Sequence, residues 1–180
     1  RIQESEKSFR KAILIKPNFF EAYINLGISL EEMNNLVGAE LAYNRAIELK
    51  PDFAISHNNL ANTLQDQERY EEAIVSFKEA IRLKADFFQA YNNLGTVYFK
   101  LSNLEKAESN YRSAILIMPD FAEAYHNLGK TCQELGKYDE ALDNFNRAIS
   151  IKPDYANSYF NLAITLYKLH RPLEAEDNYR

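Results

Sequence analysis

The sequence predicts an all-α fold, an α-α superhelix (solenoid) of stacked antiparallel helix hairpins with a 34-residue repeat. Only five glycines and five prolines occur among 180 residues, and so few helix breakers favour long helices over a turn-rich β fold. Apolar residues recur three and four places apart, which is the period of one helix face. Four of the prolines share one 34-residue spacing, and an alanine fills its single vacant slot: Pro17, Pro51, Ala85, Pro119 and Pro153.

The segments between these prolines also agree with one another. Each copy opens with a segment such as FQAYNNLGTVY from Phe88, and continues with one such as KAESNYRSAILIMP from Lys106. We therefore predict one continuous solenoid that divides into the second helix of a truncated preceding repeat at 1–19, full repeats at 20–53, 54–87, 88–121 and 122–155, and a truncated repeat at 156–180.

Each copy is expected to form two helices joined by a short turn. In the third copy, Tyr91 and Tyr98 lie on the apolar stripe of the first helix, and Ala107 and Tyr111 lie on that of the second. Small residues opposite large aromatics let the two helices approach closely, and a following proline ends the second helix. One hairpin cannot bury its own stripe, so neighbouring hairpins must stack to form a continuous core.

Composition excludes several classes of function. A net charge of −5 argues against nucleic-acid binding, which relies on neutralising phosphates, and no run of like charge suggests a membrane surface. Cys132 is the single cysteine, so an intramolecular disulfide and a cysteine zinc site are both excluded. No apolar stretch approaches the roughly 20 residues that span a bilayer. The sequence is compatible with a reducing compartment, and we expect a cytoplasmic location.

No catalytic constellation is present in the sequence. The chain lacks a glycine-rich phosphate loop and a nucleophile elbow, and no acidic or cysteine partner repeats beside His126 at metal-ligand spacing. His57 is expected to be a packed or capped core histidine, and Cys132 a buried apolar-like thiol. We therefore expect no enzymatic activity, cofactor or metal in this chain.

The fourth copy carries a many-place pattern that the other copies repeat in register. Its places are Tyr125, Leu128, Gly129, Cys132, Ala141, Phe145, Ala148 and Pro153. This pattern resembles the tetratricopeptide repeat family, and the resemblance covers almost the whole chain. It implies that the first helix of each hairpin lines a concave groove, and that the groove holds a protein or an extended peptide.

The resemblance assigns particular residues to the groove. The sixth place of the first helix is asparagine in all five copies: Asn25, Asn59, Asn93, Asn127 and Asn161. An asparagine amide offers one acceptor and two donors, so a row of them would grip an extended main chain, in a way similar to the asparagine ladder of O-linked N-acetylglucosamine transferase. Asparagine at this place would equally suit a helix surface or follow from duplication of one ancestral repeat. The other predicted groove residues are Asn58, Asn62, Asn92, Phe99, His126, Lys130, Phe160 and Tyr167.

Groove charge is uneven along the predicted face. The first two copies carry Glu21, Glu31, Glu32 and Asp66, and the later copies carry Lys100, Lys130 and Lys168. This distribution predicts a ligand with basic residues toward the first copies, unless these are ordinary solvated side chains. A clamp on a terminal carboxylate is disfavoured, because its cation places in the middle register hold Asn58, Glu123 and Asn127.

These observations lead to a predicted function and one alternative. We expect a protein–protein interaction scaffold that binds an extended peptide or partner segment through the asparagine ladder. The alternative is a substrate-recruiting arm of a larger transferase, such as a glycosyltransferase, whose catalytic domain lies outside this chain. Both ends of the sequence fall within repeats, which predicts exposed apolar surface there and end-to-end self-association.

Overall fold

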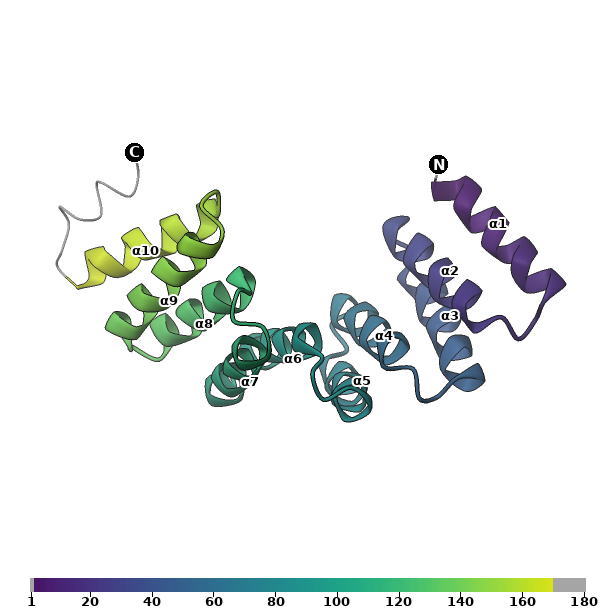
Figure 1. Ribbon diagram of the computed structural model, residues 1–180, viewed down its shortest axis with the longest axis horizontal. Coiled ribbons are helices and arrows are strands. Elements are labelled where there is room, and N and C mark those ends of the chain that lie inside the picture. Colours follow the sequence, from purple (N-terminus) through teal and green to yellow (C-terminus); the bar gives the residue numbers. More distant parts are fainter. Residues whose placement is uncertain (1, 170–180) are drawn as a thin grey trace. The chain divides into compact units, whose positions relative to one another are not determined.

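The computed structural model describes residues 2–169, and all regular structure in that range is helical. Within each of the two units described below, consecutive helices are joined by short connections and pack side by side as antiparallel neighbours (Figure 1). The predicted all-α class is therefore confirmed. The helices are α1 (Ile2–Ile15), α2 (Phe20–Glu32), α3 (Leu36–Leu49), α4 (Ala54–Asp66), α5 (Tyr70–Leu83), α6 (Phe88–Lys100), α7 (Leu104–Ile117), α8 (Ala122–Glu134), α9 (Tyr138–Ile151) and α10 (Ala156–Lys168).

The chain divides into two compact units, and the boundary in the sequence lies between Asp86 and Phe87. In unit 1 each of α1 to α4 packs on the next helix, and in unit 2 each of α6 to α9 does the same. Within unit 2, α8 also contacts α6 and α10. We call α2, α4, α6, α8 and α10 the first helices, and α1, α3, α5, α7 and α9 the second helices.

Close contact between first and second helices depends on glycine facing an aromatic ring. A Cβ atom built on Gly95 would lie 2.8 Å from Cε1 of Tyr111, and one built on Gly129 would lie 2.7 Å from Cε1 of Phe145. Both rings are buried. Tertiary packing thus confirms the predicted pairing of small residues with large aromatics, and the missing side chain sets how near the helices come.

The turn inside each hairpin contains one residue in the left-handed region. Asn34, Glu68, Ser102 and Gly136 occupy equivalent places, with φ of 58°, 60°, 56° and 73°. Only Gly136 adopts this conformation without a steric cost from Cβ. The repeat therefore retains one turn geometry even where its sequence does not favour it.

The connections between hairpins end the second helices at equivalent residues. α5 ends at Leu83, and Lys84 N donates to Ala80 O at 2.9 Å, although Ala85 replaces the proline found in the other copies. His57 Nε2 lies 2.8 Å from Pro51 O, so His57 is capped by a loop carbonyl, as predicted, but is half-buried and lies outside the core. The predicted truncated repeat extends to residue 180, and its part beyond 169 lies outside the described residues.

Candidate functional site

The sixth place of the first helices carries five asparagines, which we call the amide row: Asn25 and Asn59 in unit 1, and Asn93, Asn127 and Asn161 in unit 2. Asn25 is exposed and the other four are half-buried, so each has a solvent-facing part. Asn127 Nδ2 donates to Asn92 Oδ1 at 3.1 Å, and Asn161 Nδ2 donates to Asn157 O at 3.1 Å. An amide has two donor hydrogens and one acceptor, so one such bond leaves further capacity for a ligand.

The fifth place, predicted to face the groove, is buried at four of its five positions, and three of these four residues are polar. Asn58, Asn92 and His126 are only 7%, 1% and 6% exposed. In unit 2, Asn92 Nδ2 donates to Glu123 Oε1 at 3.0 Å, and His126 Nδ1 lies 2.9 Å from Ser158 Oγ. The prediction that Asn58, Asn92 and His126 face an open groove is therefore wrong, because all three side chains are buried.

The buried imidazole also loses basicity. Burial, with a smaller contribution from the nearby Lys130 ammonium, lowers the pKa of His126 from 6.5 to about 4. His126 is thus neutral at physiological pH and bonds the Ser158 hydroxyl from α10. Its role in unit 2 is to join two first helices.

The remaining predicted groove residues keep accessible surface. Asn62, Phe99 and Lys130 are half-buried, whereas Phe160 and Tyr167 of α10 are 55% and 73% exposed. Lys130 Nζ lies 5.2 Å from the centroid of the Phe99 ring, within the range of a cation–π contact. These positions offer apolar and cationic groups beside the amide row.

A small cavity opens beside Phe99 in unit 2. Its volume is about 40 Å³, and we call it the Phe99 pocket. Phe99, Asn127 and Lys130 were predicted as groove residues, whereas Tyr111 was assigned to the core. The pocket is lined by Thr96 and Phe99 of α6, Tyr111 of α7, and Asn127 and Lys130 of α8.

Tyr111 brings a polar atom from the core to this pocket. Its hydroxyl donates to Thr96 Oγ1 at 3.2 Å, and burial raises the pKa of Tyr111 to about 12. The ring itself is buried and packs against Gly95 of α6. The choice of Tyr here, where two other copies have Phe77 and Phe145, was the signal that could have identified it.

The equivalent junction in unit 1 contains a carboxylate. Tyr43 Oη donates to Glu31 Oε2 at 2.8 Å, and Thr63 Oγ1 donates to Glu31 Oε1 at 2.5 Å. Glu31 was predicted as a groove charge, and the structure shows it bound by hydroxyls from α3 and α4. Burial raises the pKa of Tyr43 strongly, with the Glu31 charge adding to the effect, so this hydroxyl remains a donor.

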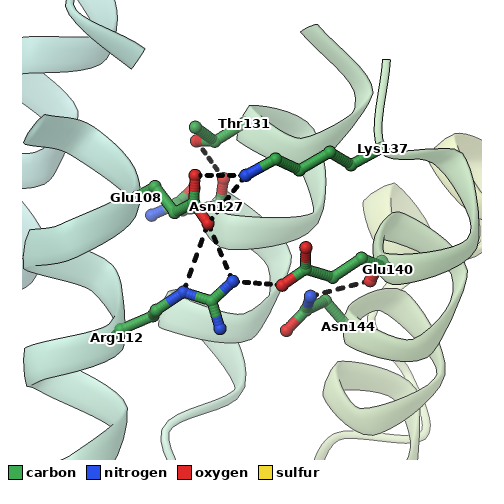
Figure 2. A network of polar contacts seen from close by, with 7 residues as sticks. All are labelled: Glu108, Arg112, Asn127, Thr131, Lys137, Glu140 and Asn144. Carbon is green, nitrogen blue, oxygen red and sulfur yellow. Dashed lines mark hydrogen bonds and ion pairs between the residues drawn. The ribbon is translucent and has the colours of Figure 1, made fainter. Parts of the chain in front are cut away.

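The second helices are joined by ion pairs of similar design in both units. In unit 2, Glu108 lies between Lys137 and Arg112, and Arg112 also bonds Glu140 of α9 (Figure 2). Lys137 Nζ approaches Glu108 Oε2 at 2.8 Å. Burial alone would raise the pKa of Glu108, but hydrogen bonds from Lys137 and Arg112 outweigh it and lower that pKa below its usual range.

Unit 1 repeats this ion pair beside a larger cavity. Arg69 Nη1 lies 2.7 Å from Glu40 Oε2, and Arg69 Nη2 lies 2.6 Å from Glu72 Oε2. These three charged residues line a cavity of about 280 Å³ together with Leu60 and Leu64 of α4. The Arg69 guanidinium is already paired with two carboxylates, so this cavity has no unpaired charge with which to bind a charged ligand.

The described residues contain no group that suggests catalysis by a metal or a nucleophile. No cluster of three histidine, cysteine or acidic residues suited to a metal occurs among residues 2–169. Cys132 is buried, and burial, followed by the charges of Glu140 and Glu108, raises the pKa of its thiol to about 12. A thiol in this state is a poor nucleophile. Within the same range, no helix combines the length and apolar character needed to cross a bilayer.

Comparison with solved structures identifies several proteins with similar folds. YrrB, described as "a TPR protein with an unusual peptide-binding site", is 27% identical with a TM-score of 0.77, over 96% of this chain and 91% of that chain. MamA is 24% identical with a TM-score of 0.79, over 89% and 87%. Pseudomonas aeruginosa PilF is 22% identical with a TM-score of 0.83, over 89% and 73%. The search of curated proteins finds no significant match.

Family models agree with these structures over most of the sequence. A model described as TPR repeat matches residues 64–102. Models described as tetratricopeptide repeat match residues 20–53, 42–75, 86–154 and 120–180. With its helix pairs, its glycine–aromatic contacts and these matches, the chain belongs to the tetratricopeptide repeat family.

Proposed function

We propose that the first helices form a groove that binds an extended peptide segment of a partner protein, with the amide row holding its main chain. The observation that carries this proposal is that all five amide-row asparagines occupy one place and keep solvent-facing surface. A peptide unit presents one N–H and one C=O, and an asparagine amide can bond both. YrrB, which has a similar fold, is described as having a peptide-binding site, and this adds support.

Main-chain bonds alone are not sufficient for useful affinity. Each hydrogen bond contributes about 0.5–1.5 kcal/mol net, whereas ordering each peptide residue costs about 1–2 kcal/mol. Side-chain contacts must therefore supply the difference. Phe160 and Tyr167 expose large apolar surfaces near Asn161 on α10, and they suit apolar side chains of a ligand.

The test begins with selection of extended peptides from a random library, followed by measurement of the best binder by fluorescence polarisation. Changing Asn59, Asn93 and Asn127 together to alanine should weaken binding at least tenfold and preserve the helical circular dichroism spectrum. The matched control changes Asn44, Asn110 and Asn146 to alanine, because these asparagines lie on second helices. Equal losses in both variants, or binding unaffected by the first, would contradict the proposal.

The transferase alternative uses the same face. An asparagine row similar to that of O-linked N-acetylglucosamine transferase would present substrates to a catalytic domain elsewhere in a parent protein. A full-length transcript that encodes such a domain would support this alternative over an independent scaffold. End-to-end self-association also remains a prediction, and the mass from light scattering should rise with concentration.

A further inference from the structure

Two junctions between first helices have the same architecture but different chemistry. Glu31, Tyr43 and Thr63 of unit 1 occupy the same repeat places as Phe99, Tyr111 and Thr131 two copies later in unit 2. In unit 1 the Glu31 carboxylate of α2 accepts hydrogen bonds from Tyr43 of α3 and Thr63 of α4. This junction thus supplies its own anion.

The junction in unit 2 has kept hydroxyl donors but has no carboxylate at the place of Glu31, and its Glu123 carboxylate accepts from Asn92 Nδ2 at 3.0 Å. Phe99 stands where Glu31 stands in unit 1, and the Phe99 pocket opens beside it. The Tyr111 hydroxyl bonds only the neutral Thr96 hydroxyl, at 3.2 Å. Thr131 donates to Asn127 O within its own helix, at 2.8 Å.

A cation has been added at the same junction. Lys130 occupies the place that is Asn62 in unit 1, and its side chain lines the Phe99 pocket. Its ammonium lies over the Phe99 ring, and among residues 2–169 no carboxylate lies within ion-pair distance of it. The lining therefore includes donors from Tyr111, Asn127 and Lys130 but no anion.

We propose that the Phe99 pocket binds the carboxylate of an aspartate or glutamate side chain from a bound peptide, in the place that Glu31 fills in unit 1. A water molecule needs about 10–15 Å³ of such space, so a cavity of about 40 Å³ suits a group with two oxygens. Hydrogen bonds from an ammonium to a carboxylate are stronger than those between neutral groups, which favours an acid over its amide.

This inference rests on the proposed peptide-binding function and adds ligand chemistry to it. Asn127 belongs both to the amide row and to the pocket lining. A peptide main chain held at Asn127 would therefore place an acidic side chain beside Lys130. The pocket would thus select one side chain of the peptide, while the amide row binds the peptide main chain whatever its sequence.

Three peptides test the proposal against the intact chain. The first is an acetylated and amidated alanine–serine peptide with one central glutamate. The second has glutamine in place of that glutamate, and the third has glutamine together with a free terminal carboxylate. Binding is followed by nuclear magnetic resonance of the ¹⁵N-labelled protein, and acetate and its neutral twin acetamide are titrated in parallel.

The expected result is that the glutamate peptide binds at least tenfold more tightly than the other two. Acetate, but not acetamide, should shift the amide signals of Phe99, Asn127 and Lys130. Equal binding of the glutamate and glutamine peptides, with no acetate effect, would overturn the proposal. Preference for the third peptide would also overturn it, because the site would then bind chain ends.

Two variants and one control locate the effect. F99E places a carboxylate where Glu31 has one, and K130Q removes the cation, so each should reduce the glutamate preference to less than twofold. K78Q removes an exposed lysine from a second helix, α5, and should keep the full preference. If F99E disturbs folding by circular dichroism, K130Q still decides the outcome.

The same measurements separate this proposal from the proposed function. Equal binding of glutamate and glutamine peptides that depends on the amide row would leave peptide binding intact and remove the pocket's role. Failure of every peptide, together with acetate shifts that F99E abolishes, would remove peptide binding and keep a carboxylate pocket.

Discussion

The α2–α4 junction of unit 1 and the α6–α8 junction of unit 2 differ at several places of the repeat, including the place that holds Glu31 in unit 1 and Phe99 in unit 2. Glu31 satisfies the hydroxyls of Tyr43 and Thr63, whereas Phe99 leaves a cavity beside Tyr111. The helices beneath are alike, with glycine against tyrosine in both hairpins. A repeat can thus change the chemistry of one face while the fold beneath it stays the same.

A third junction shows an intermediate solution. Gln133 stands at this place in α8, and its Nε2 donates to Thr165 Oγ1 at 2.6 Å and to Asn161 O at 3.2 Å. A neutral amide therefore joins α8 to α10 where a carboxylate joins α2 to α4. Whether this place carries an acid, an amide or a phenyl ring decides whether the junction is closed or open.

The largest expected effect comes from converting the closed junction into the open one. Glu31→Phe removes two hydrogen bonds to a charged group, each worth about 1.5–3 kcal/mol, and leaves the buried Tyr43 hydroxyl poorly satisfied. We expect a loss of about 3 kcal/mol in unfolding free energy. Urea unfolding followed by circular dichroism measures it.

Glu31→Gln is the matched control for that change. It retains the shape and one acceptor oxygen, as Gln133 does naturally, and should cost less than half as much. Equal losses for the phenylalanine and glutamine variants would mean that charge, rather than occupancy of the junction, stabilises unit 1.

A smaller difference between the units is sensitivity to acid. His126 has a folded-state pKa of about 4, below the ordinary 6.5, so its stabilising contribution is present above pH 6.5 and is lost as the pH falls toward 4. In this window the unfolded chain binds a proton that the folded chain does not. We expect a loss of up to about 2 kcal/mol between pH 7 and pH 5 from this group.

His126→Asn tests the acid effect, because asparagine is the natural residue at this place in α4 and α6. The difference between the urea unfolding midpoints at pH 7 and pH 5 should be smaller in this variant than in the original chain. An unchanged difference between the two midpoints would show that carboxylates, and not His126, carry the pH dependence.

The smallest expected effect concerns the turn that all four hairpins share. Glu68→Gly should raise stability and Gly136→Ala should lower it, each by about 1 kcal/mol, because left-handed backbone penalises a Cβ atom. No atom lies within 4 Å of a Cβ built on Gly136, so its change reports backbone conformation alone. Thermal unfolding measures the change in melting temperature of each variant. Two changes in the same direction would contradict this account.

Repeat spacing made most of the fold predictable. The prolines, the apolar period and the pairing of glycine with aromatics predicted the hairpins, and the amide row was predicted to have an accessible surface. The prediction was wrong for Asn58, Asn92 and His126, because periodicity places a residue on a helix face but does not show how far the next helix covers it. The repeat boundaries and the binding roles remain predictions.

The sequence by itself determined the helix pairs, the stacking and the row of amides, because each depends on local period or on identity at a repeated place. Only the tertiary structure decided which polar residues meet across a junction. The contact of Glu31 with Tyr43 and Thr63, and the cavity beside Phe99, each involve side chains from three different helices. Their geometry depends on the packing distance between helices, which no single repeat encodes.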